Sequence, residues 1–156
     1  MKGDADVVGL LNEVLTAELT AINQYFVHGM MCHNWRYERL AKRSHDESIG
    51  EMKHAQELIE RILYLEGVPN MQRYMKINVG QDVPEQLQFD LQLERDAVGR
   101  LNPGIELCRA RADNGSRLLL ERILHEEEGH IDWLEAQLQQ IKDIGAANYL
   151  AQQIDE

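Results

Sequence analysis

The segments Glu51-Met52-Lys53-His54 and Glu127-Glu128-Gly129-His130 decide the fold of this 156-residue chain. In each segment a glutamate lies three residues before a histidine, and this Glu-x-x-His pattern occurs nowhere else in the sequence. On a helix, residues three apart share a face, so each segment would present a carboxylate and an imidazole in the same direction. One such pair arises often by chance, so the spacing between the two segments decides whether they form one site.

The glutamates and histidines of the two segments are 76 positions apart, from 51 to 127 and from 54 to 130. The same offset joins Glu18 to Glu94, and both of these glutamates have apolar neighbours. A carboxylate that faces an apolar core is unfavourable unless a cation accompanies it. Two half-sites, each with a lone glutamate and a Glu-x-x-His pair, form the ligand set of carboxylate-bridged di-metal bundles. Such ligands suit iron or manganese and also bind zinc. The sequence therefore predicts a buried centre for two metal ions, held by Glu18, Glu51, His54, Glu94, Glu127 and His130.

Apolar residues recur at spacings of three and four on both sides of these motifs, which predicts helices. We expect a first helix from a cap at Asp4 or Asp6 to about residue 33, and others over about 36–65, 84–111 and 116–144. Residues 66–83 lack the helical pattern but are numerous enough to span the length of a bundle. Asn102-Pro103-Gly104 is expected to kink the third helix. The prediction is one all-α domain over residues 1–156, a four-helix bundle with a long crossover connection and a short C-terminal fifth helix near 148–154.

Composition argues against several other classes of protein. The chain has 27 acidic and 16 basic residues, a formal net charge of −11 and no basic run, so we expect no nucleic-acid partner. No segment approaches the ~20 consecutive apolar residues of a membrane span, and we expect neither a membrane partner nor a signal peptide. Cys32 and Cys108 form no CxxC motif and are interpreted as reduced, packed thiols of a cytoplasmic protein.

Three further predictions concern residues around the centre. Tyr25 lies two turns after Glu18, where its hydroxyl would either hold a ligand carboxylate or belong to an ordinary packed tyrosine. Glu126 and Glu128 are expected to be solvated. Met52 points about 130° away from the predicted centre at 100° per residue. It would join an outward apolar surface, which favours a partner subunit over a haem, although a thioether can also ligate haem iron. The other expected members of that surface are Leu19, Ile22, Phe26, Ile49 and Ile59.

These motifs resemble bacterioferritin along nearly the whole chain. The resemblance rests on Met1-Lys2-Gly3-Asp4, Glu18, Ala21-Ile22-Asn23-Gln24-Tyr25-Phe26, Glu47-Ser48-Ile49, Glu51-Met52-Lys53-His54-Ala55, Leu65-Glu66-Gly67, the 127–130 segment and Asn148-Tyr149-Leu150. It implies a ferritin-like bundle that assembles as a homo-oligomeric shell of 24 subunits built from two-fold dimers. The six residues would form a ferroxidase centre with two irons per subunit. Met52 from each of two subunits would ligate one shared haem b, and a bacterioferritin-associated ferredoxin would supply electrons for iron release.

The chain departs from this family pattern at positions 45, 46 and 50, and Pro103-Gly104 in the third helix is also unusual for the family. Family members often carry a histidine at position 46 and an aspartate at position 50 as an iron site on the inner wall, where this chain has Asp46 and Gly50. That site, and the route by which iron reaches the cavity, are therefore in doubt. Position 45, often a tyrosine near the haem, is His45.

The predicted function is iron storage and detoxification by a ferroxidase that oxidises Fe²⁺ to Fe³⁺ and deposits ferric mineral inside the shell. Glu51 and Glu127 would bridge the two irons, while Glu18 and Glu94 would each bind one. An alternative is a di-iron carboxylate oxidase or peroxidase of the ferritin-like superfamily, which shares the ligands but would need a substrate pocket. A DNA-protecting mini-shell would instead build its metal site between subunits. The sequence leaves open the choice of oxygen or hydrogen peroxide, the haem occupancy and the presence of a second subunit type.

Overall fold

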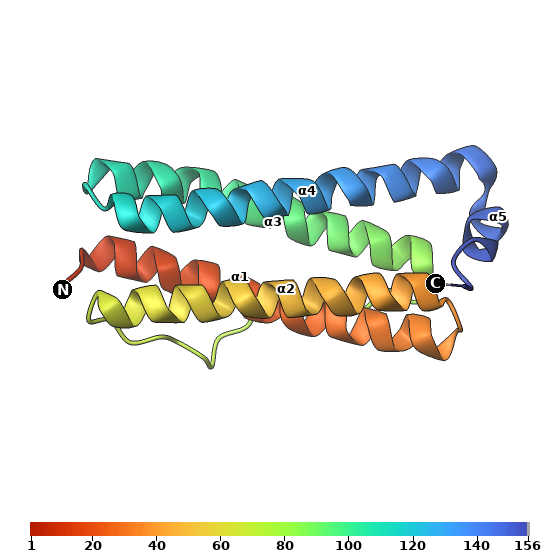
Figure 1. Ribbon diagram of the computed structural model, residues 1–156, viewed down its shortest axis with the longest axis horizontal. Coiled ribbons are helices and arrows are strands. Elements are labelled where there is room, and N and C mark those ends of the chain that lie inside the picture. Colours follow the sequence, from red (N-terminus) through yellow and green to blue (C-terminus); the bar gives the residue numbers. More distant parts are fainter. Residues whose placement is uncertain (156) are drawn as a thin grey trace.

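The computed structural model describes residues 1–155, and this part of the chain is all-α. Its four long helices form a bundle, and a short fifth helix lies at one end (Figure 1). The predicted helical bundle with a crossover and a C-terminal fifth helix is therefore confirmed. The helices are α1 (Ala5–Asn34), α2 (Glu38–Tyr64), α3 (Val83–Ala110), α4 (Asn114–Ile144) and α5 (Ala146–Ala151).

The long helices pair along the chain, α1 with α2 and α3 with α4, and the crossover connects the two pairs (Figure 1). This connection, residues 65–82, leaves the end of α2 and runs the length of the bundle to the start of α3 at the opposite end. Because it covers that length, α2 and α3 run in the same direction, and α1 is antiparallel to α3. All four long helices can then contribute side chains at one level in the middle of the bundle.

Aspartate side chains begin three of the four long helices. Asp4 accepts hydrogen bonds from the backbone N–H groups of residues 6 and 7, Asp82 from that of residue 85, and Asp113 from that of residue 116. Each satisfies backbone donors that have no partner inside the helix. The predicted choice between Asp4 and Asp6 is thus decided in favour of Asp4.

The Asn102-Pro103-Gly104 segment does not end the third helix, since α3 remains helical through Pro103. Gly104 is buried where α3 meets α1. A Cβ atom at this position would come within 3.0 Å of the Leu10 side chain, so the absence of a side chain lets the two helices approach closely.

Apolar side chains form two clusters, one toward each end of the bundle. In every long helix the predicted metal-site residues lie between the two clusters or at the edge of one. The first cluster contains Val7, Leu11, Val14, Leu15, Leu19, Ala55, Leu58, Ile62, Leu65, Leu101, Ile105, Cys108, Leu119, Leu120 and Ile123. The second contains Cys32, Leu40, Ala41, Val83, Leu87, Leu91, Leu134 and Tyr149. The apolar core is thus interrupted by a polar layer in the middle of the bundle.

Part of the predicted outward apolar surface is present on α1 and α2. Met52 is 50% exposed, and Phe26 and Ile49 are also exposed. The prediction was wrong for Leu19, which is buried in the first apolar cluster, and Ile22 and Ile59 pack partly against that cluster. Within residues 1–155, no helix combines the length and the apolar character that a membrane span requires.

Candidate di-metal centre

The six predicted residues converge in the polar layer, with one glutamate each from α1 and α3 and one Glu-x-x-His pair each from α2 and α4. Their ligand atoms form two groups, in each of which all atoms lie within 4.8 Å of one another. Glu51 and Glu127 belong to both groups, so their carboxylates lie between the two positions. The first group is Glu18, Glu51, His54 and Glu127, and the second is Glu51, Glu94, Glu127 and His130.

Both histidines direct Nδ1 toward the carboxylates. His54 Nδ1 lies 3.4 Å from a Glu51 oxygen and 3.4 Å from a Glu127 oxygen, and His130 Nδ1 lies 3.3 Å from Glu94 Oε1. These distances exceed those of most hydrogen bonds, so the inner atoms surround a common point without pairing closely.

The inner atoms of the cluster fit a cation site. Among the described residues, six of these atoms are buried without a hydrogen-bond partner: Glu18 Oε2, both Glu51 oxygens, His54 Nδ1, Glu94 Oε2 and Glu127 Oε1. Buried polar atoms in this situation are unfavourable unless a ligand satisfies them. Four carboxylates and two imidazoles match the requirements of two divalent cations in both charge and ligand type.

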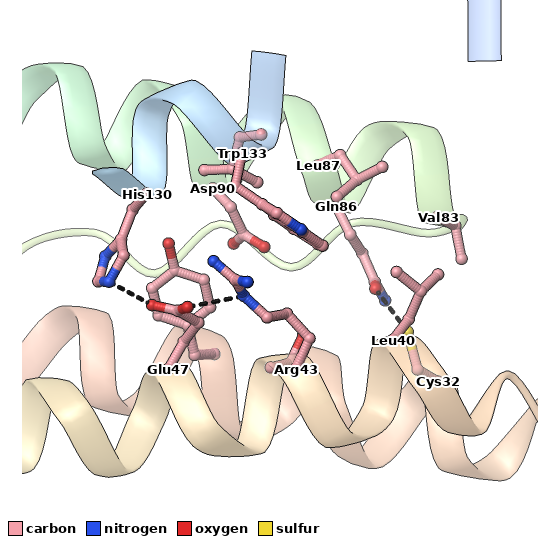
Figure 2. Close-up of a pocket in the computed structure, with 13 residues that line it drawn as sticks. Cys32, Leu40, Arg43, Glu47, Val83, Gln86, Leu87, Asp90, His130 and Trp133 are labelled. Atoms are coloured by element: carbon pink, nitrogen blue, oxygen red, sulfur yellow. Dashed lines mark hydrogen bonds and ion pairs between the residues drawn. The ribbon is translucent and has the colours of Figure 1, made fainter. Parts of the chain in front are cut away.

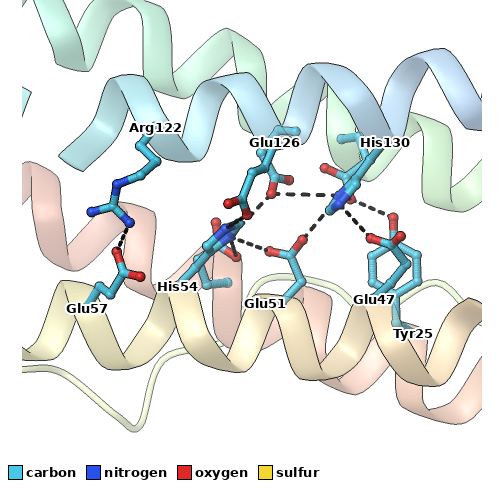
Figure 3. Close-up of polar contacts among 11 residues, drawn as sticks. Tyr25, Glu47, Glu51, His54, Glu57, Arg122, Glu126 and His130 are labelled. Carbon is cyan, nitrogen blue, oxygen red and sulfur yellow. Dashed lines mark hydrogen bonds and ion pairs between the residues drawn. The ribbon is translucent and has the colours of Figure 1, made fainter. Parts of the chain in front are cut away.

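The outer nitrogen of each histidine contacts a carboxylate from the opposite helix (Figure 3). His130 Nε2 on α4 lies 2.7 Å from Glu47 Oε2 on α2, and His54 Nε2 on α2 contacts Glu126 on α4. Such outer partners fix the orientation of a ring and leave Nδ1 available to a metal. Glu126 is solvated as predicted, with a side chain that is 51% exposed, and its contact with His54 was not predicted from the sequence. The sequence did not indicate this role for Glu47, because Glu47 and Glu126 are not separated by the 76 positions that relate the other residues of the centre.

Arg43 extends the contacts of Glu47 away from the centre (Figure 2). Its Nε lies 2.8 Å from Glu47 Oε1, and its guanidinium carbon lies 4.1 Å from the centre of the Trp133 ring. The arginine charge partly neutralises Glu47, and the stacking on Trp133 restrains the guanidinium. The position of His130 is therefore supported by residues of both α2 and α4.

Tyr25 holds a carboxylate of the centre, which decides between its two predicted roles. Its hydroxyl donates to Glu94 Oε1 at 2.5 Å, and both side chains are buried. Burial, followed by the charge of Glu94, raises the pKa of Tyr25 well above its usual value. The phenol therefore stays protonated and remains a donor to Glu94.

The concentration of carboxylates changes their protonation. Burial, followed by the charges of neighbouring glutamates, raises the pKa of Glu18 and of Glu94 well above the usual value, and burial also raises that of Glu127. Burial opposes the ionisation of Glu51 as well, but the proximity of Glu18 and of the two histidines lowers its pKa. Burial opposes protonation of both histidines, yet their carboxylate partners raise the histidine pKa values above the usual range. The centre thus carries negative charge that either protons or metal cations can neutralise.

A cavity of about 250 Å³ lies beside the centre, between α1, α3 and the crossover. The carboxylates of Glu18, Glu51, Glu94 and Glu127 line it, together with Met75, Lys76 and Asn78 of the crossover and Arg100 of α3. The cavity thus extends from the buried carboxylates to the exposed crossover residue Lys76.

Known proteins resemble this chain in sequence over almost their whole length. The ferritin-like domain family matches residues 8–144. The chain is 50% identical over 152 residues to the bacterioferritin of Mycobacterium bovis and to bacterioferritin BfrA of Mycobacterium tuberculosis, covering 97% of this chain and 96% of each relative. It is 47% identical over 156 residues to the bacterioferritin of Streptomyces coelicolor, covering 100% of this chain and 93% of that relative. The chain therefore belongs to the bacterioferritins, within the ferritin-like domain family.

Proposed function

We propose that this chain stores and detoxifies iron by oxidising Fe²⁺ to Fe³⁺ at the centre and retaining the ferric product inside a shell of 24 copies. The observation that carries the proposal is the pair of overlapping ligand groups with buried, unpartnered inner atoms. The bacterioferritin relatives support the storage role. The two cysteines are free and buried, which suits a cytoplasmic protein.

Fe²⁺ is the substrate and approaches through the cavity toward the four carboxylates. Glu18 and His54 would hold one ion, Glu94 and His130 would hold the other, and Glu51 and Glu127, which belong to both ligand groups, would be shared by the two. Carboxyl groups with a raised pKa release protons as cations bind, which keeps the buried charge balanced. Each Fe²⁺ gives up one electron, and one hydrogen peroxide accepts both electrons and two protons to form two water molecules. Oxygen accepting two electrons and two protons would instead form hydrogen peroxide.

Met52 is the residue proposed to ligate haem iron, with one haem b shared by two copies across a two-fold interface. The Met52 side chain is half exposed on α2, outside the groups that form the metal centre. Phe26, Met30 and Ile49 are exposed apolar residues of α1 and α2 that would cover the macrocycle or the partner copy. A bacterioferritin-associated ferredoxin is the proposed electron donor to this haem for iron release.

The alternative is a di-iron oxidase or peroxidase without storage, and the cavity beside the centre is the observation that favours it. Lys76, Asp96 and Arg100 add charged groups to a wall that already contains the four glutamates, which suits ions better than an apolar organic substrate. All six metal-site residues come from a single chain, unlike the centre of a mini-shell whose site lies between subunits.

The test is an anaerobic Fe²⁺ titration of size-fractionated protein, followed by addition of hydrogen peroxide or oxygen while the visible spectrum is recorded. We expect rapid oxidation of two irons per chain, then slower mineral growth that stays with the large assembly. Rapid oxidation without retained iron would favour the oxidase, and the absence of saturable Fe²⁺ binding would contradict both functions. A haem spectrum with thioether ligation, recorded before iron is added, tests the Met52 assignment separately.

A further inference from the structure

Three buried polar residues, Gln24, His28 and Asp90, join α1 to α3 and are called the α1–α3 seam. Gln24 Nε2 donates to Asp90 Oδ1 at 2.9 Å, and His28 Nδ1 lies 2.9 Å from the same oxygen. Gln24 and His28 are fully buried, and Asp90 is nearly so. One carboxylate oxygen of α3 therefore holds two successive turns of α1.

The same face of α1 also binds the crossover. Thr20 Oγ1 accepts a hydrogen bond from the Met75 backbone N–H at 2.8 Å, and Gln24 Oε1 accepts one from Asn78 at 3.2 Å. His28 Nε2 accepts the Gly80 backbone N–H at 3.0 Å, which leaves Nδ1 as the nitrogen that donates to Asp90. The seam thus has its acceptor, Asp90, on α3 and receives its donors from the crossover backbone, and Met75 and Asn78 also line the cavity beside the centre.

Apolar packing of α1 is sparser at this level, where Ile22 packs partly against the first cluster and Ala21 and Tyr25 are buried outside both clusters. Between Leu19 and Cys32, α1 contributes no buried member to either apolar cluster of residues 1–155. The polar contacts of the seam therefore contribute to the alignment of α1 with α3 over these turns. Tyr25 is adjacent to Gln24, and its partner Glu94 lies one turn after Asp90, so a shift at the seam would change the contact between Tyr25 and Glu94.

We propose that Asp90 is a positioning residue for one half of the di-metal centre. By holding Gln24 and His28, it aligns α1 with α3 so that the Tyr25 hydroxyl keeps Glu94 directed at the position shared with His130. This inference rests on the proposed function, because it assumes that the two ligand groups bind two cations.

The proposal predicts an asymmetric effect on the two positions. Glu94 belongs only to the group that contains His130. Glu18 belongs to the other group, and the neighbouring Leu19 in the first apolar cluster anchors that part of α1. Loss of the seam should therefore weaken the binding of one cation and leave that of the other unchanged. General loosening of the bundle would weaken the binding of both.

The experiment is an anaerobic Co²⁺ titration of the assembled protein, followed by the visible absorption of the bound metal. Wild type is expected to bind two Co²⁺ per chain. Asp90→Asn keeps an oxygen acceptor and should bind both ions as wild type does. Asp90→Leu keeps the same branching and number of side-chain heavy atoms but has no acceptor, and should weaken the binding of one of the two ions by roughly tenfold. Ser116→Ala, which removes a buried polar group of α4 with no contact to the seam, is the control and should keep both ions.

A double-mutant cycle tests whether Asp90 acts through Tyr25. Tyr25→Phe should weaken the same ion, and adding Asp90→Leu to it should lower the affinity for that ion less than about twofold further. Equal weakening of both ions, additive effects of the two changes, or loss in Asp90→Asn as large as in Asp90→Leu would overturn the inference. Gln24→Met removes one donor of the seam and repeats the test in milder form if Asp90→Leu does not assemble. Failure of wild type to bind two Co²⁺ would overturn the proposed function itself, and the inference with it.

Discussion

His54 on α2 contacts Glu126 on α4, while His130 on α4 contacts Glu47 on α2, so the two helices exchange outer carboxylates across the centre (Figure 3). The two outer carboxylates differ in exposure, since the Glu126 side chain is 51% exposed and that of Glu47 is 12% exposed. Each carboxylate orients a ring whose other nitrogen faces the buried glutamates.

Removing the exposed Glu126 carboxylate should weaken metal binding only at the position that contains His54. Glu126→Ala is expected to lower the affinity for one of two Co²⁺ ions by roughly tenfold, because the ring loses the partner that orients it. Anaerobic Co²⁺ titration measures this change. Glu128→Ala is the matched control, since Glu128 is an exposed neighbour outside both ligand groups. Identical titrations of the two variants would show that Glu126 does not orient His54.

Glu94→Ala should slow the rapid phase of Fe²⁺ oxidation by tenfold or more, on the order of the effect of lost metal ligation. The variant keeps the group that contains His54 but removes a carboxylate from the group that contains His130, so oxidation of a pair of irons becomes inefficient. Stopped-flow absorption after addition of oxidant measures the phase. Glu106→Ala, at an exposed position of the same helix, should leave it unchanged. An unaltered rapid phase in Glu94→Ala would remove Glu94 from the centre.

Met52→Leu should abolish haem binding and leave the rapid oxidation of Fe²⁺ intact. The thioether is lost, but the side chain has a similar volume, so the effect on the stability of the chain should stay below about 1.5 kcal/mol. The visible spectrum of the purified assembly and the stopped-flow rate are the two measurements. His45 lines a surface pocket with Phe26 and Met30. His45→Ala is measured in the same way, to test whether this histidine ligates the haem iron in place of Met52. A thioether-type spectrum that survives in Met52→Leu would contradict the assignment.

Asp46→His combined with Gly50→Asp should speed mineral growth without changing the rapid phase. Asp46 is exposed and pairs with Lys42 at 2.8 Å, and a Cβ atom at position 50 would meet no neighbouring atom, so both changes fit the fold. Together they would supply two metal ligands where the chain now has one. Gly50→Ala separates the effect of replacing the helical glycine from the effect of adding a metal ligand. It should stabilise the chain by up to about 1 kcal/mol. Iron uptake after the first two ions per chain is the measurement, and unaltered uptake in the double variant would show that these positions do not limit it.

Asp113 should contribute stability that depends on pH. Its carboxylate accepts from the Ser116 backbone N–H at 3.0 Å and from Arg61 Nη2 at 2.7 Å. Burial opposes its ionisation, but the hydrogen bonds from Ser116 and Arg61 lower its pKa below 3.8. A lowered pKa in the folded state means that the stabilisation is complete above the unfolded value and disappears as the pH falls through the folded value.

Asp113→Ala should therefore lower the free energy of unfolding by about 1–2 kcal/mol at neutral pH. Asp113→Asn keeps the helix cap and should lose less, about 0.5 kcal/mol, because only the charge facing Arg61 is removed. Urea titrations at a single protein concentration, repeated from pH 7 to pH 3, should show the difference between wild type and Asp113→Asn shrinking in acid. A difference that grows as the pH falls would contradict the sign of the pKa shift.

The sequence by itself determined the helices, the crossover and the six residues of the centre. Apolar spacing of three and four is a linear signal of a helix face, and a Glu-x-x-His pair is a local one. The repeated offset of 76 then linked Glu18 to Glu94 because the two halves of the bundle have equal length. These features can be inferred from the sequence because, in a regular helix, the position of a residue determines the direction of its side chain.

Only the tertiary structure decided which other side chains support the centre. Glu47 and Glu126 do not share the repeated offset, and each holds a histidine on the opposite helix, so no local pattern joins them. Tyr25 could equally have packed as an ordinary core residue until α3 placed Glu94 at its hydroxyl. Asp90 gains its partners from residues more than sixty positions away, and the crossover groups that complete the seam are backbone N–H groups. Backbone donors of an irregular segment are the same for every residue type except proline, so the sequence carries no signal for where they will bind.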